Sequence, residues 1–321
     1  MQSTDTLGRR ARLRAESTGK RVTPTERDLV WFAKLAEHGP LPSSFLLHYA
    51  KPTHRSDKRA RERLTDLFNE DNTPEAGPYL TRPPQQFRTL DSRYNQLVYD
   101  LAPAGKRALS RTRYSSEPCL ASAGPWLHRL MTSCITASIE LATLDMPDIA
   151  FIPQARILAR AQTDLRCPVR IIDPVTKRET VKDLIPDAVF GLEYRTEAGS
   201  RFRFFAVEAD RATEPATSTN FDRKSFLRSL QHYEAYVSGG AYRHHLKLTA
   251  PLLVLNISSD PKRTARMIDL TTRHYPQGNA FMLFQTWPDF GPVFRPPPPN
   301  LALLKSDWAR GGLAAFEIDI A

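Results

Sequence analysis

Two short acidic motifs, each at one end of an apolar run, constrain the fold of this chain most. Pro186-Asp187 precedes the run that begins at Ala188, and Glu208-Ala209-Asp210 closes the run Phe204-Phe205-Ala206-Val207. Short apolar runs separated by turn residues indicate β-strands, and residues 196–200 predict the turn of an antiparallel hairpin. Asp187 and Glu208 then lie at the same end of that hairpin. Asp210 shares a face with Glu208, because side chains alternate along a strand.

Three carboxylates in one place repel one another unless a cation lies among them. Oxygen ligands favour a hard divalent ion, so we expect Mg²⁺ or Mn²⁺ as the cofactor, bound by Asp187, Glu208 and Asp210. Phosphodiester cleavage is chemistry that such a site supports. The alternative is a surface hairpin with acidic residues at its edge.

Further candidate catalytic residues lie outside the hairpin. Glu140 belongs to an apolar helix expected from Trp126 to Leu144 and offers another carboxylate. Lys224 and Arg211 supply cations that could stabilise charge developing on phosphorus. Tyr233 is a candidate nucleophile, with helix packing as its alternative role. His128, in the same helix as Glu140, is more typical of a packed core residue.

The charge balance favours an anionic partner. The 321 residues include 45 Lys and Arg against 35 Asp and Glu, a formal net charge of +10. Such a surplus is typical of nucleic-acid-binding proteins, although a merely soluble basic protein also fits it. No apolar run reaches the roughly 20 residues of a membrane span, and the three cysteines lack metal-ligand spacing. We expect a cytoplasmic protein with no membrane partner.

The first third of the chain predicts a small DNA-binding domain. Residues 1–22 are polar and basic without periodicity, which predicts a disordered arm. Residues 23–110 predict three helices, two β segments and a last short helix. This order is typical of an α+β winged helix-turn-helix, whose third helix is the recognition helix. Double-stranded DNA is the expected partner, and single-stranded DNA is a second candidate.

The expected recognition helix, residues 56–69 with Arg55 just before it, is rich in cations that suit phosphates and guanine edges. Glu62 and Asp66 allow the alternative of a solvated face with intrahelical ion pairs. The expected DNA-contacting residues are Arg55, Lys58, Arg59, Arg61 and Arg63, together with Arg88 between the two β segments and Arg211 beside the acidic motif.

Residues 111–125 predict a polar linker, and residues 126–321 predict a second domain. In it, a helix and the acidic hairpin are followed by a helix at 221–237, a strand at 251–257, a helix at 261–274 and a strand at 280–284. This succession indicates stacked α and β layers. Residues 296–299 are four prolines, typical of an extended spacer.

The acidic motifs resemble those of known nucleases. Pro186-Asp187, with Glu208 about twenty residues later in an apolar strand, resembles the Pro-Asp…(Asp/Glu)-x-Lys superfamily. The string from Phe205 to Glu214 is similar to the replication-relaxation family of plasmids and other mobile elements. The resemblance covers roughly residues 23–290. It implies a winged helix followed by an α/β restriction-endonuclease-like domain, and relaxase-like nicking or cleavage of DNA at a specific site, as in plasmid mobilisation relaxases without the two-histidine metal motif.

The sequence departs from these families at two positions. Asp210 stands where the superfamily has lysine, and Ser229 stands where a lysine is expected before Tyr233. Lys224 or Arg211 is the candidate replacement for the motif lysine. Cleavage would proceed either by hydrolysis or by attack of a tyrosine that becomes covalently joined to the DNA end. A catalytically inactive DNA-binding or replication-control protein on the same scaffold is the alternative.

Overall fold

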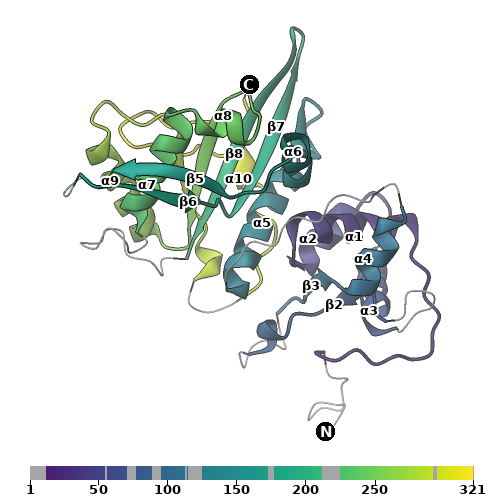
Figure 1. Cartoon of the computed structure of the whole chain (residues 1–321). Helices are drawn as coiled ribbons and strands as arrows, with labels where there is room; N and C mark the ends of the chain where they lie inside the picture. Colours follow the sequence, from purple (N-terminus) through teal and green to yellow (C-terminus); the bar gives the residue numbers. More distant parts are fainter. Residues whose placement is uncertain are drawn as a thin grey trace. The chain divides into compact units, whose positions relative to one another are not determined.

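The structure is a computed structural model, and it describes residues 12–54, 56–70, 77–88, 95–112, 114, 125–172, 177–211, 225–291 and 295–320. The chain divides into two compact units (Figure 1). Unit 1 comprises residues 1–119 and 293–299, and unit 2 comprises residues 120–292 and 300–321. Both units combine helices with sheets, as the expected mixture of α and β structure requires.

Unit 1 has the predicted order of helices and β segments, with one further short strand between the first two helices. Its helices are α1 (Glu26–His38), α2 (Ser43–Ala50), α3 (Asp57–Asn69) and α4 (Pro103–Ser110), with a 3-10 turn at Pro84–Phe87. Its short strands β1 (Leu41–Pro42), β2 (Leu80–Thr81) and β3 (Val98–Leu101) form an antiparallel sheet in the order β1-β3-β2. Trp31, Phe32 and Phe45 are fully buried and form the centre of the core.

The start of α1 fixes part of this core. Thr25 and Asp28 form a capping box, in which each side chain bonds the other residue's backbone, so two amide groups without intrahelical partners are satisfied. Asp28 itself is fully buried. A buried carboxylate needs a compensating cation, and that cation comes from α3, as described below.

The expectation of a disordered arm over residues 1–22 is wrong for residues 12–22. Val22 is 2% exposed, and Ser17 and Thr18 donate hydrogen bonds to the carboxylate of Glu70. No sequence pattern indicates this, because the arm is held by polar contacts to residues about fifty positions away rather than by a periodic apolar face. Residues 1–11 lie outside the described residues.

The proline segment also differs from its expected role as a spacer. The side-chain amide of Gln96 donates to the carbonyl oxygens of Pro296 and Pro297, at 2.9 Å each. Proline has no amide hydrogen but keeps its carbonyl as an acceptor, which lets this segment bind a donor. Residues 293–299 therefore belong to unit 1, not to the second domain. Most of the expected linker 111–125 lies outside the described residues.

Unit 2 is built on a sheet whose described strands are β4 (Ile149–Ile152), β7 (Ala188–Thr196), β8 (Gly199–Asp210), β9 (Leu252–Ser258) and β10 (Met282–Thr286). The strand order is β10-β9-β8-β7-β4. β8, β9 and β10 run parallel to one another, whereas β7 is antiparallel to both β8 and β4. β7 and β8 form the predicted hairpin, and its turn ends at Gly199, whose φ of 115° favours glycine.

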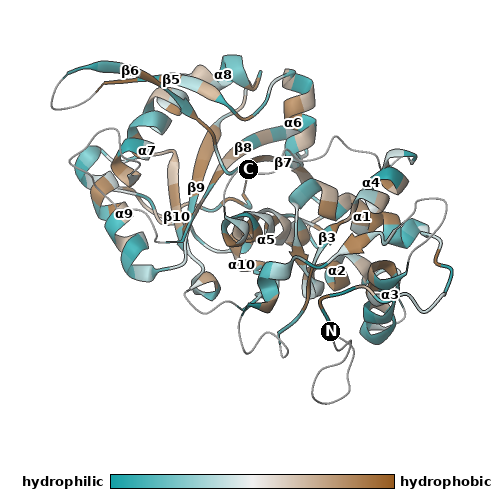
Figure 2. Cartoon of the chain, turned by 60° about the horizontal axis from the view of Figure 1, so that its bottom comes forward, coloured by the Kyte–Doolittle hydropathy of each residue, from teal (hydrophilic) through white to brown (hydrophobic). Residues whose placement is uncertain are grey.

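The helices of unit 2 are α5 (Trp126–Thr143), α6 (Gln154–Ala161), α7 (Phe226–Tyr233), α8 (Ala241–His245), α9 (Pro261–His274) and α10 (Ala302–Lys305). A π-helical turn, Glu234–Ser238, continues α7, and a 3-10 turn lies at Pro288–Phe290. A separate ribbon pairs β5 (Cys167–Ile172) with β6 (Glu179–Leu184). The central strands are largely hydrophobic, whereas β6 and α9 carry hydrophilic residues (Figure 2). None of the described helices is long and apolar enough to cross a membrane.

Candidate functional site

The strand register brings the two acidic motifs together. Ala188 pairs with Val207 in the β7–β8 hairpin, and the Asp187 amide donates to the Val207 carbonyl at 3.1 Å. Asp187 is therefore directly opposite Glu208, which confirms their predicted convergence at one end of the hairpin. Glu208 is in turn beside Asn256 of the parallel strand β9, and Asp210 is beside Ser258.

The three predicted carboxylates line one small pocket of about 80 Å³. The remaining lining residues come from α5, from β8 and the residue after it, from α7 and its cap, and from β9 and α9. They are His128, Ala209, Arg211, Ser225, Phe226, Ser229, Asn256, Arg263 and Met267.

Asp187 is fixed through both of its side-chain oxygens. Oδ1 contacts Nε2 of His128 at 2.8 Å, and Oδ2 accepts a hydrogen bond from the Ala209 amide at 2.9 Å. His128 lies in the first turn of α5, and its side chain is 21% exposed. It is therefore a residue of the acidic pocket rather than the packed core residue that the sequence suggested.

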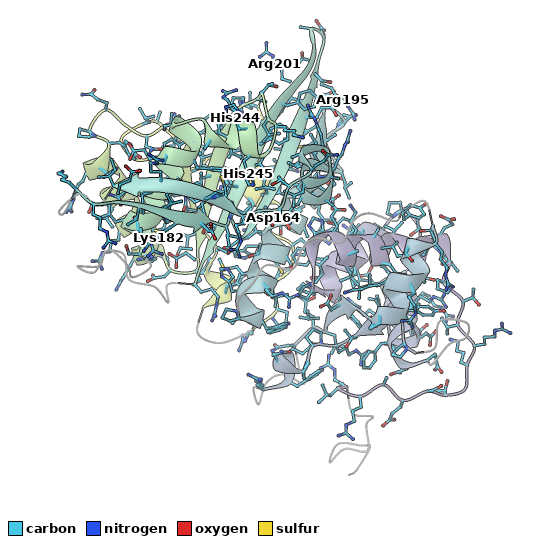
Figure 3. The ribbon with its side chains drawn as sticks, viewed as in Figure 1. Asp164, Lys182, Arg195, Arg201, His244 and His245 are labelled. Carbon is cyan, nitrogen blue, oxygen red and sulfur yellow. The ribbon has the colours of Figure 1, made fainter. Side chains whose placement is uncertain are left out.

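Glu208 is held by the predicted nucleophile. The hydroxyl of Tyr233 donates a short hydrogen bond to Oε1 of Glu208. Tyr233 is 0% exposed, and burial, together with the neighbouring Glu208 carboxylate, raises the pKa of Tyr233 well above its ordinary value. The phenol thus stays protonated, as a hydrogen-bond donor must. Tyr236, one turn later, is also buried and contacts Nδ1 of His245, which lies near Asp164 (Figure 3).

Asp210 is paired with a cation that the sequence did not indicate. Nε of Arg263, in the first turn of α9, lies 2.8 Å from Oδ2 of Asp210, and the two side chains are 9% and 18% exposed. Arg263 therefore balances the carboxylate that stands in place of the motif lysine. Neither side chain of the pair is fully excluded from water, and both charged groups line the pocket.

Arg211 follows Asp210 and also lines the pocket. It forms no hydrogen bond or ion pair with any residue that the structure describes, and its Nε is buried without a partner. An arginine in this state beside a cluster of carboxylates is available to an anion that enters the pocket. Lys224, the other candidate for the missing lysine, lies outside the described residues.

Glu140 does not join this cluster. It is buried on α5, and the residues that line the acidic pocket do not include it. It follows His128 by twelve residues, which is about 18 Å along a helix. Arg195 and Arg201 also lie away from the acidic pocket, at the turn end of the β7–β8 hairpin (Figure 3).

Asp187 and Glu208 are the two candidate oxygen ligands that this pocket offers to a hard divalent ion. Asp187 and Glu208 are on adjacent strands and face one pocket. Each carboxylate oxygen has two lone pairs, so the contacts of His128, Ala209 and Tyr233 do not exhaust its capacity to bind. Asn256 is a further oxygen donor beside Glu208. Its NH₂ lies 3.4 Å from the Val254 carbonyl and 3.3 Å from the Leu283 carbonyl, so the amide oxygen is the atom left for the pocket.

Sequence reasoning missed His128, Arg263 and Asn256. Asn256 had a usable signal, because it interrupts the otherwise apolar strand Leu252–Ile257 and polar groups are buried at a cost. Arg263 had none, since a basic residue in the first turn of a helix is usually solvated. The contacts of His128 and Arg263 join positions 59 and 53 residues apart, and no local pattern reports them.

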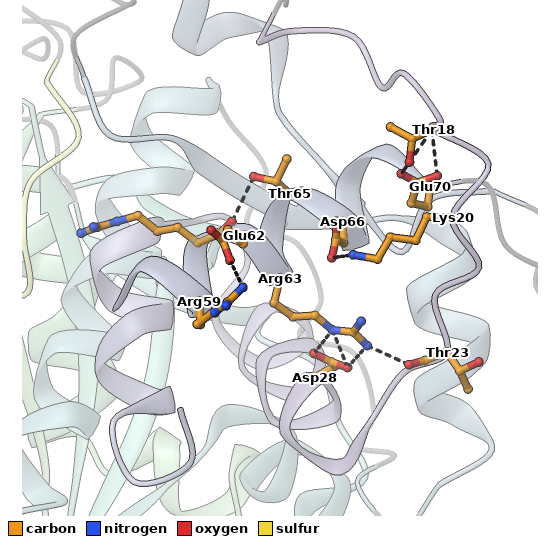
Figure 4. Close-up of polar contacts among 11 residues, drawn as sticks. Thr18, Lys20, Thr23, Asp28, Arg59, Glu62, Arg63, Thr65, Asp66 and Glu70 are labelled. Atoms are coloured by element: carbon orange, nitrogen blue, oxygen red, sulfur yellow. Dashed lines mark hydrogen bonds and ion pairs between the residues drawn. The ribbon is translucent and has the colours of Figure 1, made fainter. Parts of the chain in front are cut away.

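In unit 1, the structure separates the predicted DNA-contacting arginines into two kinds. Arg63 forms a bidentate pair with buried Asp28, with Nη2 at 2.6 Å, and also donates to the Thr23 carbonyl (Figure 4). The hydrogen bond that Arg63 donates to the Asp28 carboxylate raises the pKa of Arg63. Arg63 therefore joins α3 to the start of α1, and its guanidinium is already bound within the protein.

The other cations of α3 are exposed. Arg59 pairs with Glu62 at 2.9 Å, with side-chain exposures of 74% and 46%, and Arg61 lies 3.8 Å from Asp57. Exposed pairs of this kind are weak, so both arginines can exchange their partner for a phosphate. Lys58 and Arg88 are also exposed. Arg55 lies outside the described residues.

Residues 32–251 match the family model described as Replication-relaxation, which is more than half of the chain. This stretch runs from within α1 to the residue before β9 and includes Asp187, Glu208 and Asp210. The comparisons found no matching curated protein and no matching solved structure. The family match agrees with the resemblance seen in the acidic motifs: the chain belongs to the replication-relaxation family.

Proposed function

We propose that this protein is a DNA-binding, relaxase-like endonuclease of a mobile element that uses a divalent ion to nick or cleave DNA at a specific site. The observation that carries the proposal is the pocket in which Asp187 and Glu208 face each other across β7 and β8, with Arg211 at its edge. Membership of the replication-relaxation family supports the link to mobile elements.

Each residue of the pocket has a role in this proposal. Asp187 and Glu208 would hold Mg²⁺ or Mn²⁺, which supplies water activation and charge neutralisation at a phosphodiester when bound. His128 and the Ala209 amide orient Asp187, and Tyr233 orients Glu208. Arg211 binds the scissile phosphate and stabilises the charge that develops on it.

Hydrolysis fits the pocket better than attack by a tyrosine. A nucleophilic tyrosine must reach phosphorus and lose its proton. Tyr233 is fully buried, donates its proton to Glu208 in a hydrogen bond and has a raised pKa. Tyr236 is also buried and bonded to His245. In this proposal, therefore, water is the nucleophile and Tyr233 is a positioning residue.

Unit 1 would bind the DNA duplex as a winged helix-turn-helix. Three helices followed by the β2–β3 hairpin support this assignment, with α3 as the recognition helix. Lys58, Arg59 and Arg61 are exposed on α3 and would contact phosphates or base edges. Arg63 is excluded from this role because Asp28 binds it.

Cleavage of a supercoiled plasmid that carries the mobile element tests the proposal. Wild type should convert supercoiled DNA to open circles or linear molecules with Mg²⁺ or Mn²⁺, and a chelator should stop the reaction. Asp187→Asn should abolish cleavage. Asp183→Asn is the matched control, because Asp183 lies on the exposed ribbon, paired with Arg166, and should cleave like wild type. Ion-independent cleavage, or equal activity of Asp187→Asn, would overturn the proposal.

A second candidate function is a DNA-binding regulator or replication-control protein on the same scaffold. The Arg263–Asp210 ion pair favours it, because an arginine then supplies charge compensation that catalytic sites of this type obtain from an ion. The two candidates differ in one respect. The regulator would bind duplex DNA without cleaving it, and neither its DNA binding nor its thermal stability would change when Mn²⁺ is added.

A further inference from the structure

The recognition helix has no charge surplus of its own. From Asp57 to Glu70, α3 and its C-cap contain four basic and four acidic residues. One of the four basic residues, Arg63, is bound by Asp28. A helix with this balance provides little net attraction for a polyanion, because its carboxylates repel phosphates as its cations attract them.

The docked arm, residues 12–22, changes that balance. It contains Arg12, Arg14, Lys20 and Arg21 against the single acid Glu16. Lys20 bonds Asp66 of α3, and Thr18 binds Glu70 (Figure 4). Ser17 donates a hydrogen bond to the same Glu70 carboxylate. The arm therefore covers two of the four acids of α3 and its C-cap, and it contributes four cations, of which Lys20 is paired with Asp66.

Glu70 holds the arm on α3 through hydrogen bonds from Ser17 and Thr18, and these contacts are called the latch below. Glu70 is 2% exposed as a residue, and its carboxylate accepts hydrogen bonds from Ser17 Oγ at 2.8 Å, Thr18 Oγ1 at 2.8 Å and the Thr18 amide at 3.0 Å. Val22 is buried at the other end of the arm. Contacts to an ionised carboxylate are among the stronger hydrogen bonds, so the arm has a defined place on α3.

The N-terminal end of the described arm contacts the β2–β3 hairpin. Arg12 donates to the Asn95 carbonyl at 3.0 Å, and its own carbonyl accepts from Arg82 at 2.9 Å. Arg12 and Arg61 line one groove of about 370 Å³, together with Ser43 and Ser44 at the start of α2 and Asn95 to Leu97, Thr65 and Tyr99. The groove thus has a cation from the arm and a cation from α3.

We infer that the docked arm is the second half of the nucleic-acid interface of unit 1. The arm supplies its charge surplus, and Arg12 and Arg14 bind the phosphodiester backbone of a DNA duplex beside Arg61. This inference rests on the proposed DNA binding of unit 1. It adds that the electrostatic part of the affinity comes mainly from the arm and not from α3.

Duplex binding by the full chain over a series of salt concentrations tests the inference. Two lost phosphate contacts reduce the log–log salt slope by about 1.8, which is up to about 60-fold in affinity at 0.1 M salt. We expect this change for Arg12→Ala with Arg14→Ala. The control, Lys106→Ala with Arg107→Ala, removes the same charge from exposed positions of α4 and should leave slope and affinity close to those of wild type.

The outcomes separate the inference from the proposed function. If wild type binds no duplex, both fail. If wild type binds duplex and the arm variant keeps the salt slope of wild type, only the inference fails. The inference also fails if the control variant loses as much salt slope as the arm variant. Hydrogen exchange tests the latch independently: the Thr18 amide should be protected in wild type and lose its protection in Glu70→Ala. Rapid exchange of this amide in wild type would overturn the docked arm.

Discussion

Replacing Arg63 should destabilise unit 1 far more than replacing Arg59, although both are arginines of α3 that the sequence assigns to DNA. Asp28 has a side chain that is only 1% exposed, and Arg63 is its cation. In Arg63→Ala, Asp28 keeps only the donors of Thr25, at 2.7 and 2.9 Å.

Removing one partner of a buried ion pair costs about 3–5 kcal/mol. The Arg63 side chain is 22% exposed, so water can reach the vacated position and the cost falls below that range, to about 2–3 kcal/mol. Arg59→Ala breaks an exposed pair with Glu62, which costs about 0–1 kcal/mol. Arg63→Lys keeps the charge but not the bidentate geometry, and should recover part of the loss.

Hydrogen exchange of the α1 and α3 amides measures the opening free energy of unit 1 without interference from unit 2. Arg63→Ala should lower that free energy by the amount given above, and Arg59→Ala should barely change it. Equal, small effects of both substitutions would refute the assignment of Arg63 as a structural residue. Arg63 would then again be a candidate for contacting DNA.

Two further predictions concern Glu70 and Tyr233. Burial would raise the pKa of Glu70, but the hydrogen bonds from Ser17 and Thr18 outweigh burial and lower this pKa from its ordinary value of 4.5. The hydrogen bonds of the ionised Glu70 therefore stabilise unit 1 fully above about pH 4.5. This stabilisation is lost as the pH falls through the lower pKa that Glu70 has in the folded protein. Thr18 amide protection should fall in the same pH range, and protection that persists through acid would count against the latch. Tyr233→Phe removes the hydrogen bond to Glu208 at a cost of about 1 kcal/mol and should still cleave DNA. Loss of all cleavage, with a DNA–protein adduct formed only by wild type, would instead identify Tyr233 as the nucleophile.

The parts of the fold that the sequence predicted well are those with a strong local pattern. The acidic hairpin, α5, α9 and the buried strands β9 and β10 each have an apolar periodicity and clear end signals. β4, α6 and β6 were not predicted. β6, Glu179–Leu184, is mostly exposed and has no continuous apolar face, so a pattern based on burial cannot find it.

The site was predictable only where its residues are neighbours in a strand pair. Asp187, Glu208 and Asp210 followed from strand alternation and a turn. His128 and Arg263 reach them through tertiary contacts across more than fifty residues. The same limit explains α3, where Arg59 and Arg63 look alike in sequence but only Arg63 meets a buried carboxylate 35 residues away.

Titration of the 321-residue chain with Mn²⁺, by calorimetry and by thermal denaturation, tests the central claim most directly. Wild type should bind one ion in the acidic pocket and be stabilised by about 2.7 kcal/mol at an ion concentration of 100 times Kd. Asp187→Asn and Glu208→Gln should each weaken binding without unfolding the protein, and Asp183→Asn should bind like wild type. If wild type shows neither binding heat nor stabilisation, or if the pocket variants bind as tightly as wild type, Asp187 and Glu208 do not form a metal site.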